Sequence, residues 1–114
     1  MNEEVVEVIE SYNEYLEKVP SGSRKISDYL RGDHVENALT MILDFSDGMA
    51  WLTQASDLLK KNQVNVTFEI EKIHEFLHEI NLGLEIQDYV LVADMFEYEI
   101  APFFENVKPA SSVA

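Results

Sequence analysis

Two histidines one helical turn apart are the clearest candidates for chemistry in this sequence. His74 and His78 bracket Glu75 in the pattern H-E-x-x-H. On a helix this spacing brings both imidazoles onto one face, where they can bind zinc while the glutamate activates a zinc-bound water. A third ligand is required, and Glu97 on the following predicted helix would return to the height of His74. The pattern therefore allows a small zinc-dependent hydrolase with Glu75 as its general base and Glu97 as the third ligand.

The surroundings of the motif favour a second interpretation, in which both histidines are solvated and no metal is bound. Only three positions of the motif are fixed, and the chain contains 15 glutamates. His74 and His78 lie roughly 80–120° from the apolar stripe of their helix, counted at about 100° per residue. We therefore expect no catalytic residue and no cofactor, and we keep zinc as the alternative.

Other metal and nucleophile chemistries lack parts that they require. Glu71 with His74, and Glu75 with His78, match the E-x-x-H pairs of di-iron bundles. That chemistry needs one such pair on each of two helices, whereas here both pairs overlap on one helix. The absence of cysteine excludes thiol catalysis and cysteine-ligated zinc.

The charge of the chain limits its partners. Its 22 acidic and eight basic residues give a formal net charge of −14. Nucleic acids and anionic membranes attract Lys and Arg, so neither is expected as a partner. No apolar run approaches the roughly 20 residues that span a bilayer, and the acidic start of the chain is unlike a signal peptide. These features predict a cytoplasmic protein whose acidic surface suits a basic or helical protein partner.

The first third of the chain predicts two helices separated by a break. Apolar residues at steps of three and four indicate an amphipathic helix over residues 2–19. The Pro-Ser-Gly sequence at residues 20–22 is expected to end it, and a short helix over residues 23–32 follows. The basic residues of this short helix are Arg24, Lys25 and Arg31. We expect them to pair with acidic faces of the same fold, with a separate binding surface as the alternative.

The middle of the chain predicts two more helices. A capping box at Asp33 opens a helix that reaches Lys61. Gly48 inside it is about 1 kcal/mol less favourable than alanine, so we expect a closely packed neighbour or a bend there. The residues that follow alternate like a strand over a short stretch. A longer pattern at steps of four and three favours a helix over residues 67–82, closed by Gly83.

Residues 88–105, DYVLVADMFEYEIAPFFE, predict the last helix, with Asp88 as its N-cap and a kink at Pro102. Helical spacing gives this helix two apolar strips. One of them, which includes Phe96 and Ile100, can fill the core. The other consists of Leu91, Met95 and Tyr98. Apolar surface that a fold leaves over usually marks an interface, so the second strip predicts contact with a partner and self-association.

Together these elements predict an all-α fold, an antiparallel up-down bundle of four main helices plus one short helix. Residues 1–108 form a single domain in this prediction, and residues 109–114 form a disordered tail. Trp51 lies opposite the main apolar stripe of its helix. It either packs against the short basic segment or serves as an anchor for a partner.

Two segments carry resemblances to known proteins. Residues 88–102, DYVLVADMFEYEIAP, resemble the closing helix of a family of small, uncharacterised bacterial helical proteins, which implies a helical fold and supplies no activity. Residues 39–52, LTMILDFSDGMAWL, are similar to a central helix of flagellin export chaperones. Those proteins are small acidic helical bundles that hold the helical end of a secreted partner, and their tyrosine-rich start is not clearly matched here.

These observations predict a non-catalytic acidic helical bundle that acts through protein–protein contacts, as an adaptor or a chaperone does. We expect it to associate with itself as a homodimer or larger homo-oligomer. The alternative is the small zinc-dependent hydrolase built on the H-E-x-x-H motif.

Overall fold

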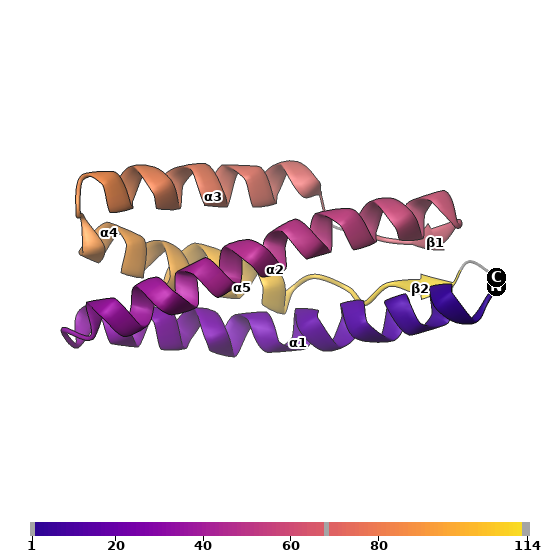
Figure 1. The fold of residues 1–114 in the computed structure, drawn as a ribbon, viewed down its shortest axis with the longest axis horizontal. Helices are drawn as coiled ribbons and strands as arrows, with labels where there is room; N and C mark the ends of the chain where they lie inside the picture. Colours follow the sequence, from indigo (N-terminus) through magenta and orange to yellow (C-terminus); the bar gives the residue numbers. More distant parts are fainter. Residues whose placement is uncertain (1, 68, 113–114) are drawn as a thin grey trace.

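Helices make up most of the structure (Figure 1). The computed structural model describes residues 2–67 and 69–112. In chain order the helices are α1 (Glu3–Arg31), α2 (Val35–Lys61), α3 (Ile70–Glu85), α4 (Tyr89–Asp94), the π-helix η1 (Met95–Ile100) and α5 (Ala101–Glu105). The last three follow one another without a gap and form one continuous helix, which we call the last helix. The predicted all-α fold class is therefore confirmed.

The helices lie along an elongated body with extents of 47 × 21 × 21 Å. Figure 1 shows α1, α3 and the last helix lying lengthwise, with α2 crossing obliquely. α1 packs against both α2 and the whole last helix, whereas α3 packs mainly against the last helix. α2 therefore does not run alongside the other helices as a regular up-down bundle requires. The antiparallel up-down arrangement stays a prediction.

α1 continues through the predicted break at Pro20. Proline inside a helix removes one backbone hydrogen bond and costs about 3 kcal/mol. Residues on both sides of it nevertheless belong to one buried stripe, in which Leu16 and Ile26 are at most 5% exposed. Burying one large aliphatic side chain contributes roughly 1.5–3 kcal/mol, so the stripe as a whole outweighs the proline. The predicted helix end at residues 20–22 and the separate short helix over residues 23–32 are wrong, because both lie within one helix of 29 residues.

Aromatic side chains join the helices in the core. The Phe45 ring on α2 meets the Phe96 ring on the last helix edge to face, with 5.1 Å between the ring centres. Tyr12 on α1 is fully buried, and its hydroxyl oxygen accepts a hydrogen bond from the Ser56 hydroxyl at 3.3 Å. Burial raises the pKa of Tyr12 to about 12. This core tyrosine is therefore neutral over the physiological pH range.

Two glycines allow helices to approach closely. A Cβ atom at Gly48 of α2 would overlap the Tyr15 hydroxyl of α1, so the close neighbour predicted at Gly48 is confirmed. A Cβ atom at Gly83 would lie 2.7 Å from the Cγ2 atom of Val92 on the last helix. The sequence predicts Gly83 as the end of its helix, but α3 continues to Glu85. Gly83 instead provides the contact between α3 and the last helix.

The helix starts agree with prediction at Asp88 and differ at Asp33. The Asp88 carboxylate accepts a hydrogen bond from the Leu91 amide at 3.0 Å, which confirms the predicted N-cap. α2 begins at Val35, and no side chain caps it. The capping box predicted at Asp33 is wrong, because this residue has a left-handed φ of 62° and shapes the turn between α1 and α2.

The third helix begins later than predicted, at Ile70 rather than at Thr67. Phe68, which the prediction includes in this helix, lies outside the described residues. The strand-like alternation before it corresponds to a short strand, β1 (Val64–Asn65). Within the described ranges, every helix falls short of the length or the apolar character that crossing a bilayer requires.

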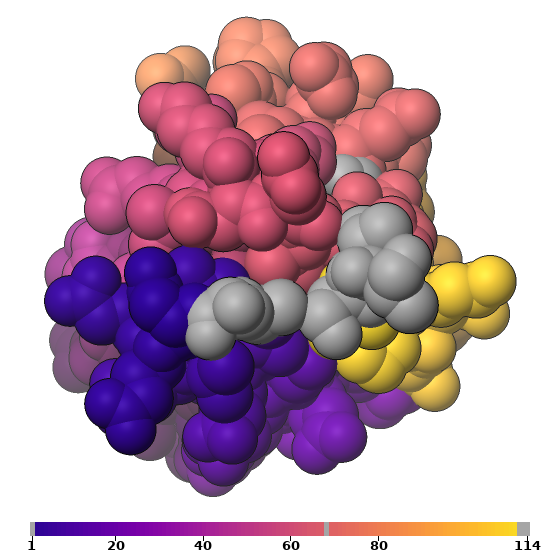
Figure 2. Space-filling view, turned by 90° about the vertical axis from the view of Figure 1, so that its right-hand side faces the viewer, coloured from indigo at the N-terminus to yellow at the C-terminus, as the bar shows by residue number. Residues whose placement is uncertain are grey.

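The chain end differs from the disordered tail predicted over residues 109–114. Ala110 exchanges two hydrogen bonds with the Asn13 side chain of α1, at 2.8 and 3.1 Å. The strand β2 (Ser111–Ser112) pairs antiparallel with β1. Figure 2 views this end of the molecule, which the start of α1, the end of α2 and the C-terminal segment share. The C-terminal segment therefore packs on the rest of the fold as far as β2. The last two residues of the chain lie outside the described residues.

Candidate interaction surface at the turn between α3 and α4

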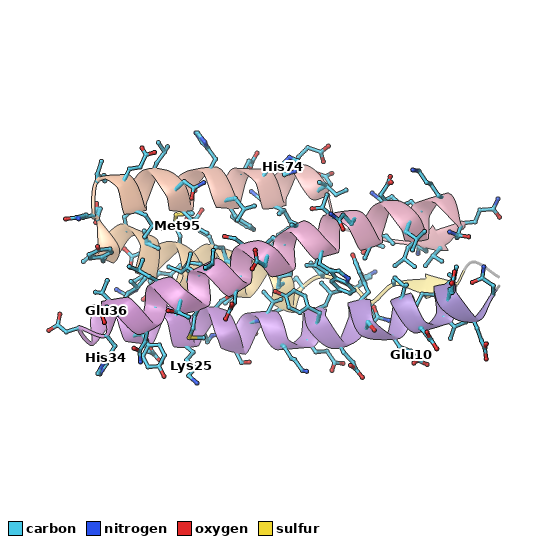
Figure 3. The ribbon with its side chains drawn as sticks, in the orientation of Figure 1. Glu10, Lys25, His34, Glu36, His74 and Met95 are labelled. Atoms are coloured by element: carbon cyan, nitrogen blue, oxygen red, sulfur yellow. The ribbon has the colours of Figure 1, made fainter. Side chains whose placement is uncertain are left out.

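The two histidines of the H-E-x-x-H motif are exposed on α3, and Figure 3 labels the first of them. Glu75 between them forms an ion pair with Lys72 at 3.3 Å. Within the residues that the structure describes, no three His, Asp or Glu side chains are placed to hold a metal ion. The structure therefore does not bring His74 and His78 together with Glu97, the third ligand of the zinc alternative.

Glu97 instead connects the last helix to α1. Its carboxylate accepts a hydrogen bond from the Ser27 hydroxyl at 3.4 Å and lies 3.7 Å from the Nε atom of Arg31. The Arg31 guanidinium also donates to Asp94 at 2.7 Å. A hydrogen bond with Tyr98 and the positive charge of Arg31 lower the pKa of Glu97. The carboxylate is thus kept ionised by its neighbours in the fold.

The basic segment of α1 pairs with the acidic last helix, as the sequence predicts. Arg24 forms an ion pair with Glu105 at the end of the last helix, and Arg31 forms the pairs described above near its middle. Lys25 lies 5.7 Å from the centre of the Tyr29 ring. Because the two arginine side chains are 36–47% exposed, solvent screens these pairs and each contributes little to the stability of the fold. Their main effect is to fix how α1 and the last helix are aligned.

The three residues of the predicted interface strip do not share one surface. Leu91 and Tyr98 are exposed by 44% and 66%, whereas Met95 is only 2% exposed. Met95 is therefore a core residue, and its assignment to an exposed strip is wrong. Trp51, the other candidate anchor, packs edge to face on Tyr15 at 6.0 Å rather than on the basic segment.

A π-helical turn explains the failure of the predicted strip. Four of the seven buried side chains of the last helix follow steps of four: Val92, Phe96, Ile100 and Phe104. On an α-helix of 3.6 residues per turn, each step of four drifts by about 40°, so such a stripe would rotate away from the core. In η1 the turn is wider, and the Ala101 amide donates to the carbonyl of Phe96, five residues back. The wider turn holds the stripe inward and increases the angle between Met95, which is buried, and Tyr98, which is exposed.

A different apolar surface lies where α3 turns into α4. It consists of four exposed side chains, which we call the corner patch: Leu82 (49% exposed), Ile86 (70%), Val90 (67%) and Leu91 (44%). The turn beneath it is well fixed. Gln87 has a left-handed φ of 54°, and the Asp88 amide donates to the Gly83 carbonyl at 2.9 Å. Exposed apolar side chains that are grouped in this way mark interaction sites.

The surroundings of the corner patch are acidic. Between Ile73 and Val107 the chain has eight Asp and Glu residues and no Lys or Arg. Arg24 and Arg31 of α1 pair with three of these carboxylates, those of Asp94, Glu97 and Glu105. Glu79 and Glu85 on α3 are exposed and form no ion pair within the described part of the chain. Negative charge therefore flanks the patch on the side of α3.

Sequence reasoning found Leu91 but missed the other members of the corner patch. The segment LGLEIQDYVL, residues 82–91, holds six large apolar residues. The helical stripes of the two predicted helices account for only Leu84 and Tyr89. The surplus was therefore visible in the sequence. Leu82 lies on α3, Ile86 in the turn and Val90 on α4, so they come close to one another only because the turn reverses the chain.

The chain matches one protein family along nearly its whole length. The family is described as a domain of unknown function, DUF8042, and its model covers residues 7–110. The chain therefore belongs to this family. No curated protein and no solved structure matches the chain. The resemblance to a small helical family without an assigned activity is thereby confirmed.

Proposed function

We propose that this member of the DUF8042 family is a non-catalytic docking protein whose corner patch binds an apolar segment of a basic protein partner. The observation that carries the proposal is the exposure of four large apolar side chains around one turn in an acidic part of the chain. A partner helix with apolar residues on one face and Lys or Arg beside them has the complementary character.

The energetics of the corner patch support binding. Burying one aliphatic side chain contributes roughly 1.5–3 kcal/mol before the loss of freedom on association is subtracted. The backbone beneath the patch is already ordered by the Asp88 cap and by the hydrogen bond from Asp88 to Gly83. Little ordering energy is therefore needed on the side of this protein.

The sign of the charge favours a basic partner over a second copy of the chain. Positive residues beside the apolar face of a partner would meet Glu79 and Glu85. Two copies joined at the corner patch would instead bring like charges together, which is unfavourable. Salt screens both effects, so the two arrangements respond to salt in opposite directions. Binding of a basic partner weakens as salt rises, whereas a homodimer through the patch becomes tighter.

A designed helical peptide of leucine and lysine, with leucines along one face, tests the proposal by fluorescence anisotropy. We expect Ile86→Ser combined with Val90→Ser to weaken binding about tenfold or more, because the two most exposed side chains of the patch are lost. The matched control is Leu43→Ser on α2, where the side chain is 64% exposed and lies outside the patch.

Two outcomes would contradict the proposal. Equal loss of binding in the Leu43→Ser control would show that the peptide binds without regard to the patch. Equal binding of a peptide with glutamate in place of lysine would show that charge does not select the partner. Sedimentation of the protein alone at low and high salt decides the alternative of self-association, because a dimer at the patch must strengthen with salt.

A further inference from the structure

α2 carries a second exposed apolar surface. Four of its large apolar side chains are between 37% and 64% exposed, and we call them the α2 face: Leu39, Leu43, Trp51 and Leu58. Counted at about 100° per residue, the four lie within roughly 120° of one another, on the side opposite the buried stripe of α2. The corner patch lies at the turn between α3 and α4, so the α2 face is a separate surface.

Opposite charges lie at the two ends of the α2 face. Glu36, labelled in Figure 3, is exposed in the first turn of α2 and forms no ion pair within the described part of the chain. Lys61 is the last residue of α2, and its side chain is 73% exposed. Its ion pair, at 3.0 Å, is with Asp57 one turn earlier on the same helix. Both charges are therefore accessible to a partner.

We propose that the α2 face pairs with the α2 face of a second copy of the chain, with the two helices antiparallel. In a two-fold symmetric pair, each contact between two different residues occurs twice. The midpoint between Leu39 and Leu58 is also the midpoint between Glu36 and Lys61. An antiparallel pair that brings Leu39 beside Leu58 therefore also brings Glu36 to Lys61. A parallel pair would instead bring like charges together at both ends, which is unfavourable.

The centre of the α2 face allows two helices to approach closely. Ser46 and Ala50 lie near the midpoint, and their side chains are small. Small side chains at the point of contact suit the shorter distances between packed helices, about 8 Å between axes. Asp47 opposes association, because its carboxylate would lie near the same carboxylate of the second copy.

The size of the α2 face limits the strength of the pair. With 27 residues, α2 is about 40 Å long and about 10–12 Å wide. Pairing along its length covers roughly 400–500 Å² of each copy, whereas stable interfaces bury about 800 Å² per partner. Each copy also carries a net charge of −14, so the two copies repel. We therefore expect a weak, reversible dimer rather than a permanent one.

Sedimentation equilibrium of the full chain, at concentrations up to about 1 mM, tests the dimer. Leu39→Ser combined with Leu58→Ser should raise the dissociation constant about tenfold or more, because the apolar contacts on both sides of the midpoint are lost. Both leucines are exposed, so the melting temperature should stay nearly unchanged. The matched control is the corner-patch double variant, Ile86→Ser with Val90→Ser, which should dimerise normally.

Two results of the sedimentation experiment would overturn the proposal. One is a protein that stays monomeric at about 1 mM, and the other is a dimer that only the corner-patch variant weakens. Peptide binding at the corner patch is measured separately, so the failure of either proposal is distinct from the failure of the other.

Cysteine cross-linking tests the register of the pair, because the chain has no cysteine of its own. A mixture of the variants Leu39→Cys and Leu58→Cys should form a disulfide on mild oxidation, because the two positions lie side by side in the antiparallel pair. Either variant alone should react at least about tenfold more slowly, because its two copies lie roughly 28 Å apart along the helices. Cross-linking of Leu39→Cys with itself at the rate of the mixture would indicate parallel helices and overturn the assignment.

An exchange of charges tests the contacts at the two ends. Glu36→Lys and Lys61→Glu should each weaken the homodimer several-fold, because like charges then meet at both ends. A mixture of the two variants should recover the affinity of the unaltered protein, because opposite charges meet again. Glu36→Lys also lowers the net negative charge, which by itself would strengthen association. Stronger association of Glu36→Lys alone, or no recovery in the mixture, would therefore overturn the antiparallel pairing.

Discussion

Two helices of this protein contain a proline, Pro20 in the interior of α1 and Pro102 in the first turn of α5, and they accommodate it in different ways. α1 passes Pro20 as an uninterrupted helix of 29 residues. The last helix adopts a π-helical turn over Met95–Ile100 and reaches Pro102 just beyond it. Around Pro20, the buried residues Val19, Ser23, Ile26 and Leu30 lie at steps of four, three and four, and Ser27 is buried beside Ile26. In the last helix Val92, Phe96, Ile100 and Phe104 follow steps of four, and Ala93, Met95 and Ala101 are buried beside them.

In both helices the spacing of the buried side chains agrees with the local helical geometry. Alternating steps of three and four match the 3.6 residues of an α-helical turn, so α1 keeps its regular form despite a lost hydrogen bond. Repeated steps of four exceed that period, and the last helix widens locally to keep its apolar side chains in the core.

The largest expected effect distinguishes the π-helical turn from a regular α-helix. Met95→Ala should lower the free energy of unfolding by about 2–5 kcal/mol, because Met95 is buried. Tyr98→Ala should change it by about 0.5 kcal/mol or less, because Tyr98 is 66% exposed. Urea unfolding of both variants gives the two values. Similar losses would mean that these residues share one face, as a regular helix requires.

Replacing the two prolines is expected to change the stability by less, and it compares them directly. Pro20→Ala should stabilise the protein by about 1–3 kcal/mol, because it restores a donor in the interior of α1. Pro102→Ala should give no such gain, because proline at the start of a helical segment removes no needed bond. A slight loss of about 0.4–1 kcal/mol is expected from the freer unfolded chain. Thermal unfolding measures both, and equal gains would contradict the comparison.

The smallest effect concerns the ionic link between these two helices. The pKa of Glu97 is lowered in the folded state, so its stabilising contribution is present above the unfolded value of about 4.5 and disappears as the pH falls through the folded value. The stability difference between the unaltered protein and Glu97→Gln should therefore be constant near neutral pH and shrink in acid. The measurement is urea unfolding across this pH range.

Arg31 provides the control for the ionic link. In an Arg31→Met background the effect of Glu97→Gln should be reduced, because the two charges interact directly. An unchanged effect would assign the lowered pKa to the hydrogen bonds with Tyr98 and Ser27.

The sequence predicts most helices because their signals are local. The apolar stripe and the two terminal lysines predict the end of α2 correctly, at Lys61. Asp88 caps the last helix as predicted. The pairing of Arg24 and Arg31 with acidic faces follows from their scarcity among many carboxylates. The predicted binding strip was only partly recovered, since Leu91 is exposed but Met95 is not. A rule of 100° per residue cannot anticipate a turn that widens in response to packing.

The amino-acid sequence alone determined the helical class, the acidic character and the absence of thiol chemistry, because composition and local spacing carry these properties. The tertiary structure alone decided that α1 runs through Pro20, that Glu97 faces Arg31 rather than the histidines, and that four apolar side chains meet at the corner patch. These outcomes depend on energies gained between helices that are distant in sequence. The free energy gained from these contacts exceeds the local structural preference of a single proline or of a five-residue motif.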